Sequence, residues 1–269
     1  MKKKFKIGVI GAGFMSYAII NGILKSKTLK QKQIIVSDLS ENALNKAKDS
    51  FGIFTTNDNK FLCDNSEFVL FAVKPQSFYD VASSIKDSVA DKFISIMAGI
   101  KTDKIRSIFP NSCVARCMPN TPCSIGCGAI GLDVFDYKNQ ADIDFIVSVF
   151  SSLGTVVILP EEKLNAVTGV SGSSPAYFYL FLKGIIDAGI KEGLSESEAK
   201  TLAVNTMIGS GEMVKNNADK SLDELISAVC SKGGTTIEAI NTYNDGKLND
   251  LTEKAIRACV KRSEELENL

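Results

Sequence analysis

The chain has 269 residues, enough for one large domain or two domains of ordinary size, and we expect two. Its 31 Lys and Arg balance 31 Asp and Glu, so we expect no nucleic-acid partner and no broad attraction to an anionic membrane. The sequence contains no histidine, which excludes a Ser-His-Asp triad, a histidine-ligated metal and an imidazole general base.

The spacing of the cysteines and the length of the apolar runs predict where in the cell the protein works. Seven cysteines are spread without a regular framework, which favours reduced thiols in the cytoplasm. Cys123 and Cys127 have no histidine to complete a metal-binding set, so no metal site is expected. The N-terminal apolar run is interrupted by Gly11 and Gly13 and lacks the cleavage site of a secretory signal. The stretch "AYFYLFLKGIIDAGI" is broken by charges and too short to span a bilayer, so we expect a soluble cytoplasmic protein.

From Phe5 to about Pro160, short β-branched runs alternate with helical patterns at the spacing of βαβ units. The runs expected to form strands are "KIGVI", "QIIVSD", "FVLFAVK", "KFISIMAG", "CVARCM" and "TVVIL". This alternation predicts an α/β, Rossmann-like dinucleotide-binding domain over residues 1–161. Its sheet is expected to be mainly parallel, with helices on both faces and ligands at the carboxyl ends of the strands.

A glycine pair follows the first expected strand. Gly11 and Gly13 open a helix, and Ser16 stands where the G-x-G-x-x-G pattern has its third glycine. Gly11 permits a tight turn, Gly13 lets a pyrophosphate approach the backbone, and the small Ser16 keeps the helix close to the strand. The turn therefore predicts dinucleotide binding, with a plain strand-to-helix turn as the alternative.

The second expected strand ends in Ser37 and Asp38. An acidic residue at this distance from the glycines can hydrogen-bond the adenosine ribose of NAD. Ser37, with Lys46 and Lys48 nearby, could instead accommodate a 2′-phosphate, and Asp38 could be a turn or capping residue. The sequence leaves the choice between NADPH and NADH open.

Two expected strands end in prolines, in "FAVKPQ" and in "RCMPNTP" from Arg116 to Pro122. Proline stops a strand ladder and turns the chain across the edge of the sheet. Beside the glycine turn, these two strand ends favour a shaped cleft for a nicotinamide nucleotide over ordinary loops.

The second domain, residues 162–269, is expected to be all α-helical, because strand patterns disappear after Pro160. Its expected helices are 173–192, 195–215, 220–228, 235–244 and 248–266. The first is apolar on several sides, a pattern typical of a buried helix, and the other helices offer little bulk to cover it. We therefore expect a homodimerisation domain, with a larger assembly left open.

Five motifs together resemble the pyrroline-5-carboxylate reductase family, in its order and spacing over nearly the whole chain. They are "GVIGAGFM" at 8–15, "FAVKP" at 71–75, "RCMPNTP" at 116–122, "AVTGVSGSSPAY" at 166–177 and "GGTTIEAI" at 233–240. The resemblance implies hydride transfer from NADPH or NADH to the C=N bond of 1-pyrroline-5-carboxylate, which gives L-proline. It also implies a helical domain that interlocks with its twin.

The resemblance assigns site residues on both sides of the reaction. For the cofactor it implies Gly11, Gly13, Phe14 and Met15 at the pyrophosphate, Ser37 and Asn59 at the adenosine, and Ala72, Val73, Lys74 and Pro75 at the nicotinamide half. For the imino acid it implies that Ser231 helps bind the substrate and that the catalytic Thr236 hydroxyl contacts the ring nitrogen, and Gly233, Gly234 and Thr235 are expected to hold the carboxylate. Glycines ahead of a helix expose N–H groups where a carboxylate is favoured, although a tight turn with a threonine N-cap explains the same residues.

Three residues depart from the family pattern: Lys232 replaces a usual proline, Asn165 a frequent aspartate, and Leu39 an arginine that can meet a 2′-phosphate. Lys232 either attracts the substrate anion or faces solvent, and we favour the second alternative. Two other functions stay open. One is a related reductase of another cyclic imino acid, and the other is a paralogue that binds the nucleotide without catalysis.

Overall fold

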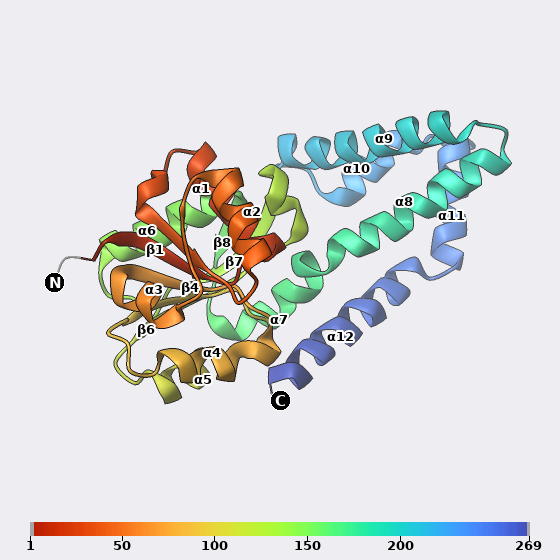
Figure 1. Ribbon diagram of the computed structural model, residues 1–269. Helices are drawn as coiled ribbons and strands as arrows, with labels where there is room; N and C mark the ends of the chain where they lie inside the picture. Colours follow the sequence, from red (N-terminus) through yellow and green to blue (C-terminus); the bar gives the residue numbers. More distant parts are fainter. Residues whose placement is uncertain (1–2, 268–269) are drawn as a thin grey trace. The chain divides into compact units, whose positions relative to one another are not determined.

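The computed structural model describes residues 3–267, which form two compact units (Figure 1). One unit, called here the sheet unit, extends to Ser173 and takes up the chain again from Cys259. The other, called the helical unit, is Ser174–Ala258. Within residues 3–267, no helix combines the length and the apolar character needed to cross a membrane.

The sheet unit is built on eight strands in the order β3-β2-β1-β4-β5-β6-β7-β8. Neighbouring strands are parallel except β6 and β7, and Ile7 on β1 pairs with Ile34 on one side and Phe68 on the other. The mainly parallel sheet is confirmed. The strands are β1 (Phe5–Ile10), β2 (Ile34–Ser37), β3 (Phe54–Thr56), β4 (Ser66–Phe71), β5 (Lys92–Ser95), β6 (Cys113–Met118), β7 (Gly128–Asp133) and β8 (Gly154–Ile158).

Two of these strands were not expected from the sequence. β3 is a three-residue edge strand, too short to show a period, and its Phe54 is exposed. β7 contains Gly128 and Gly131, and glycine is depleted in strands. The structure explains Gly131, because a Cβ there would lie 2.8 Å from Cγ1 of Val167. Val167 packs so closely on β7 that position 131 must be glycine, and this glycine interrupts the run of β-branched residues that usually indicates a strand.

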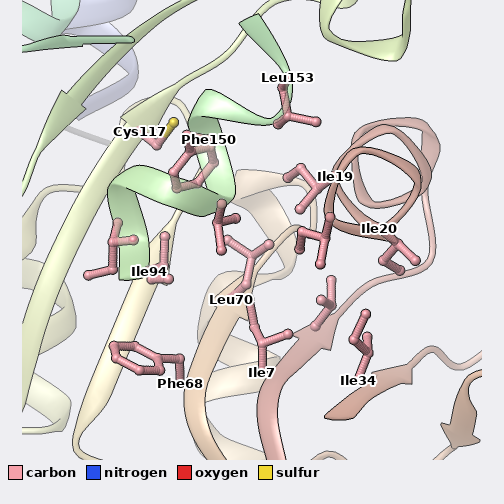
Figure 2. Packing of buried hydrophobic residues seen from close by; sticks show 14 of the residues in the cluster. Ile7, Ile19, Ile20, Ile34, Phe68, Leu70, Ile94, Cys117, Phe150 and Leu153 are labelled. Carbon is pink, nitrogen blue, oxygen red and sulfur yellow. The ribbon is translucent and has the colours of Figure 1, made fainter. Parts of the chain in front are cut away.

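Helices cover both faces of the sheet. One face packs against α1 (Phe14–Lys25), α2 (Glu41–Phe51) and α6 (Gln140–Ser151), and the other against α3 (Asn59–Asn65), α4 (Phe78–Ile85) and α5 (Thr102–Ile108). Figure 2 shows the first layer, where Ile19 and Phe150 lie over strand residues Ile7 and Leu70. The short turns are η1 (Gln31–Gln33), η2 (Pro75–Ser77), η3 (Thr121–Ile125), η4 (Glu161–Lys163), α7 (Leu164–Val167) and the π-helical η5 (Thr168–Gly172).

The helical unit contains no strand among its residues, all of which the structure describes, as the sequence predicts. Its helices are α8 (Ser174–Lys191), α9 (Glu196–Asn216), α10 (Leu222–Val229), α11 (Thr235–Asp245) and α12 (Leu248–Glu267), whose last residues belong to the sheet unit. α8 is less covered within one chain than its composition predicts: Phe178, Tyr179 and Leu180 are 58%, 63% and 73% exposed. An apolar surface of this kind is typical of an interface between subunits.

The end of α12 is fastened to the sheet unit by polar side chains. Glu267 accepts a hydrogen bond from Nδ2 of Asn165 at 3.0 Å and pairs with Nζ of Lys101 at 2.8 Å, while Ser263 donates to Oδ1 of Asn165 at 2.7 Å. Gly99 has a φ of +74°, and a Cβ there would lie 2.9 Å from the backbone of Leu266. Asn165 therefore suits this place better than aspartate, because an aspartate would put a carboxylate oxygen in place of the Nδ2 donor, facing the carboxylate of Glu267.

A partly buried ion pair joins β6 to the turn after β8. Glu161 accepts hydrogen bonds from Nη1 of Arg116 at 2.8 Å and from the Thr102 backbone N–H at 2.7 Å, and the Arg116 side chain is 3% exposed. Burial by itself raises the pKa of the Glu161 carboxyl, but these hydrogen bonds and the guanidinium charge outweigh it, so the pKa is lowered.

We expect Glu161→Gln to lower the free energy of unfolding by about 3 kcal/mol, because the Arg116 charge stays buried without its partner. A lowered pKa stabilises the fold fully above the carboxyl's unfolded pKa, and that contribution is lost as the pH falls through the folded one. The wild type should therefore lose stability in this acidic range more steeply than the variant. Urea unfolding at several pH values measures both effects. Glu162→Gln, at an exposed neighbouring position, is the control, and equal stability of both variants would contradict the role of the pair.

Candidate functional site

The turn between β1 and α1 requires glycine at position 11. Gly11 has a φ of +100°, and its N–H donates to the Ser37 carbonyl at 2.7 Å. A Cβ at this position would lie 2.7 Å from the Ala72 carbonyl oxygen, closer than van der Waals contact allows. The backbones of β1, β2 and β4 therefore converge on this turn.

Gly13 presents open space at the start of α1. It is the N-cap of that helix, and nothing lies within 4 Å of where its Cβ would stand. The N-cap has no side-chain acceptor, so the first N–H groups of α1 stay available to an anion. Ser16 is fully buried, and its hydroxyl donates to the Gly11 carbonyl at 2.5 Å. This hydrogen bond explains how a serine fits at the position where the G-x-G-x-x-G pattern has its third glycine. Phe14, 61% exposed, and the half-buried Met15 follow at the same helix start.

Ser37 and Asn59 are brought together at the end of β2. The Ser37 hydroxyl is buried and donates to Oδ1 of Asn59 at 2.6 Å, and Nδ2 of Asn59 donates to the Ser84 hydroxyl at 3.4 Å. Asp38 acts as a turn residue: Oδ2 accepts from the Ala12 N–H at 2.7 Å and Oδ1 from the Ser40 N–H at 2.8 Å.

The loop after β4 lies directly beside the glycine turn. The Ala72 N–H donates to the Ile10 carbonyl at 2.9 Å, and Cγ1 of Val73 is 3.1 Å from where a Gly11 Cβ would stand. Lys74 is exposed, and Pro75 begins η2, so the strand ends at Phe71, before all four expected nicotinamide residues.

Sequence reasoning assigned no role to Asn120, which connects two of the motifs. Its side chain is buried, with Nδ2 donating to the Ser171 carbonyl at 3.1 Å and Oδ1 accepting from the Ala129 N–H at 3.1 Å. The loop "RCMPNTP" is thereby joined to the π-helical turn within "AVTGVSGSSPAY". A polar residue between two prolines after a strand was the available signal.

The expected substrate residues lie together between α10 and α11, in the helical unit. Gly233 has a φ of +72°, the Gly234 N–H donates to the Ser231 carbonyl at 3.0 Å, and a Cβ at Gly234 would lie 2.3 Å from the Ser231 hydroxyl. The N-cap of α11 is Gly234 and has no side-chain acceptor, so the interpretation of a threonine N-cap is wrong. Thr235 is exposed and Thr236 half-buried at this helix start.

Burial removes several cysteines from chemistry. It raises the pKa of the Cys63 thiol to about 12 and also raises the pKa values of Cys117 and Cys123. These three thiols are protonated near neutral pH, so none of them is a ready nucleophile.

The mainly parallel sheet, the required Gly11 and the open start of α1 define the class of the sheet unit as a dinucleotide-binding domain. In agreement, the family model described as NADP oxidoreductase, coenzyme F420-dependent, matches residues 6–99. The model described as pyrroline-5-carboxylate reductase dimerisation matches residues 161–266.

Full-length relatives identify the family. Pyrroline-5-carboxylate reductase of Haemophilus influenzae is 38% identical over 98% of this chain and 98% of its own, and that of Synechocystis 32% over 97% and 98%. The chain therefore belongs to the pyrroline-5-carboxylate reductase family. Two solved structures agree: the reductase of Coxiella burnetii has a TM-score of 0.89 at 30% identity, covering 98% of this chain and 99% of that one. The reductase of Plasmodium falciparum, solved with NADP bound, has 0.88 at 28%, covering 99% of both.

Proposed function

We propose that the protein reduces the C=N bond of 1-pyrroline-5-carboxylate to give L-proline, with NADPH or NADH as the hydride donor. The observation that carries this proposal is likeness to curated reductases over 97% or more of the chain. In this chain, α1 and α11 both begin after a glycine N-cap without a side-chain acceptor. The competing functions, reduction of another cyclic imino acid and nucleotide binding without catalysis, have no comparable support.

The sheet unit suits the cofactor, because the space beside Gly13 is open and the first N–H groups of α1 have no side-chain cap. When bound, the reduced nicotinamide supplies the hydride. We assign the pyrophosphate to Gly11, Gly13, Phe14 and Met15, the adenosine to Ser37 and Asn59, and the nicotinamide half to Ala72, Val73, Lys74 and Pro75.

The start of α11 suits the substrate carboxylate. We assign it to Gly233, Gly234 and Thr235 at the positive end of this helix, with the Ser231 hydroxyl beside them. The N–H groups of Gly233 and Thr235 are the proposed donors, because the Gly234 N–H already donates to the Ser231 carbonyl. The Thr236 hydroxyl donates a hydrogen bond to the ring nitrogen. Electron density on that nitrogen rises as the C–H bond forms, so this donor stabilises the transition state more than the ground state.

We also propose that the chain has two domains with different functions. Residues 1–161 bind the dinucleotide, and residues 162–269 bind substrate and form the homodimer, a boundary supported by the dimerisation model, which begins at residue 161. The exposed apolar side chains of α8 are the expected contact between subunits. Sedimentation equilibrium measures whether dimers assemble further. Reduced thiols favour a cytoplasmic location.

The test is a steady-state assay that follows oxidation of the reduced nicotinamide with five-membered and six-membered cyclic imino acids. We expect kcat/KM to be at least about tenfold higher for the five-membered ring, a difference of about 1.4 kcal/mol in transition-state binding. Equal or faster turnover of the larger ring would assign the protein to the related reductase. Failure of the protein to restore growth of a proline auxotroph, despite binding NAD(P)H, would favour the non-catalytic paralogue.

A further inference from the structure

The end of β2 holds a fixed negative charge. Oδ2 of Asp38 accepts from the Ala12 N–H at 2.7 Å and Oδ1 from the Ser40 N–H at 2.8 Å. The carboxylate is thus held beside the glycine turn, at the place where dinucleotide-binding folds meet the adenosine ribose. Because a carboxylate offers about four lone-pair sites, Asp38 can still accept a hydrogen bond from a ribose hydroxyl.

The start of α2 adds a second negative charge instead of an open anion site. The Ser40 hydroxyl accepts from the Ala43 N–H at 3.3 Å as the N-cap, and Glu41 stands in the first turn. The positive end of this helix is therefore already matched by the carboxylates of Asp38 and Glu41. A 2′-phosphate at this place would meet two like charges.

Three lysines could supply a cation near the end of β2: Lys46 and Lys48 on α2, and Lys60 next to Asn59 on α3. Nζ of Lys46 lies 5.1 Å from the centroid of the Tyr17 ring, and Nζ of Lys60 pairs with Asp64 at 2.5 Å. Lys48 comes seven residues after the first residue of α2, about 10 Å along the helix axis. Lys46 and Lys60 thus already have partners, and none of the three lysines forms an ion pair with Asp38.

We propose that Asp38 makes this chain select NADH over NADPH. The inference rests on the proposed function and resolves its open choice of hydride donor. NADH carries a free 2′-hydroxyl that can donate a hydrogen bond to the Asp38 carboxylate. NADPH carries a phosphate in its place, which the carboxylates of Asp38 and Glu41 repel. Leu39, which is 90% exposed and follows Asp38 directly, brings no compensating cation.

Calorimetric titration of the full-length protein with NAD⁺ and with NADP⁺ tests the inference through binding alone. We expect NAD⁺ to bind at least about tenfold more tightly, the size of a single unfavourable charge contact near a protein surface. NADP⁺ binding as tightly as NAD⁺, or more tightly, would overturn the proposal.

Two substitutions locate the cause. Asp38→Asn removes the charge, and Leu39→Arg adds a cation at an exposed position; each should shift the affinity ratio toward NADP⁺ by about tenfold. Leu39→Gln is the neutral control and should leave the ratio unchanged. Melting temperatures check folding, since Asp38→Asn loses one backbone hydrogen bond while Leu39→Arg keeps both. An unchanged ratio in Leu39→Arg, or in a folded Asp38→Asn, would remove the end of β2 from cofactor selection.

Binding and turnover separate this inference from the proposed function. Selection of NAD⁺ by a protein that does not reduce 1-pyrroline-5-carboxylate would refute the function and leave the role of Asp38 standing. Reduction of the imine with higher kcat/KM for NADPH than for NADH would do the reverse.

Discussion

Thr236→Ala is expected to lower kcat for 1-pyrroline-5-carboxylate about 100-fold, the usual effect of removing one hydrogen-bond donor that stabilises transition-state charge. Thr236 stands at the start of α11, in the helical unit, whereas the glycine turn belongs to the sheet unit. The dissociation constant for the reduced cofactor should therefore stay nearly the same. Stopped-flow hydride transfer and fluorescence titration of the cofactor measure the two quantities.

Matched variants on α11 separate the hydroxyl from the helix. Thr236→Ser keeps the donor and should retain most of the rate. Thr242→Ala removes a hydroxyl that donates to the Glu238 carbonyl at 2.9 Å on the same helix, and should leave the rate unchanged. A Thr236→Ala rate equal to wild type would remove this threonine from the mechanism.

Gly13→Ala is expected to weaken cofactor binding at least tenfold, about 1.4 kcal/mol, while the melting temperature stays within about one degree of wild type. The φ of Gly13 is −83°, which alanine adopts freely, and a Cβ at position 13 would have no protein atom within 4 Å. The new methyl group therefore leaves the fold alone and occupies the space assigned to the pyrophosphate.

Gly11→Ala provides the contrast at the same turn. A side chain at a φ of +100°, with its Cβ 2.7 Å from the Ala72 carbonyl, should destabilise the fold itself by about 1–3 kcal/mol. Thermal unfolding and cofactor titration of both variants distinguish the cases. Undiminished cofactor affinity in Gly13→Ala would move the pyrophosphate away from the start of α1.

Residues that act through the local backbone were predictable from the sequence. The alternation of runs gave the α/β sheet followed by helices, and Gly11 and Gly233 do take positive φ values. Strand β7 was missed because its glycines serve close packing against segments distant in the chain, such as Val167. No local periodicity records such a contact.

The same distinction holds for the candidate site. Ser37 was identified by its place after a strand, but its bond to Asn59 joins residues 22 apart and became visible only in the fold. Asp38 was ambiguous because ribose binding and turn formation use the same acidic residue at the same position. Asn120 was overlooked because its two partners, at Ala129 and Ser171, lie on different elements.

The fastening of the α12 end has a consequence for biosynthesis. A nascent chain leaves the ribosome with its N-terminus first, and the N-terminal domain generally folds before the later ones. The sheet unit, however, takes up the chain again at Cys259, and the partners of Lys101 and Asn165 arrive only with Glu267. Its eight strands can assemble early, but the unit is completed only when α12 has left the ribosome.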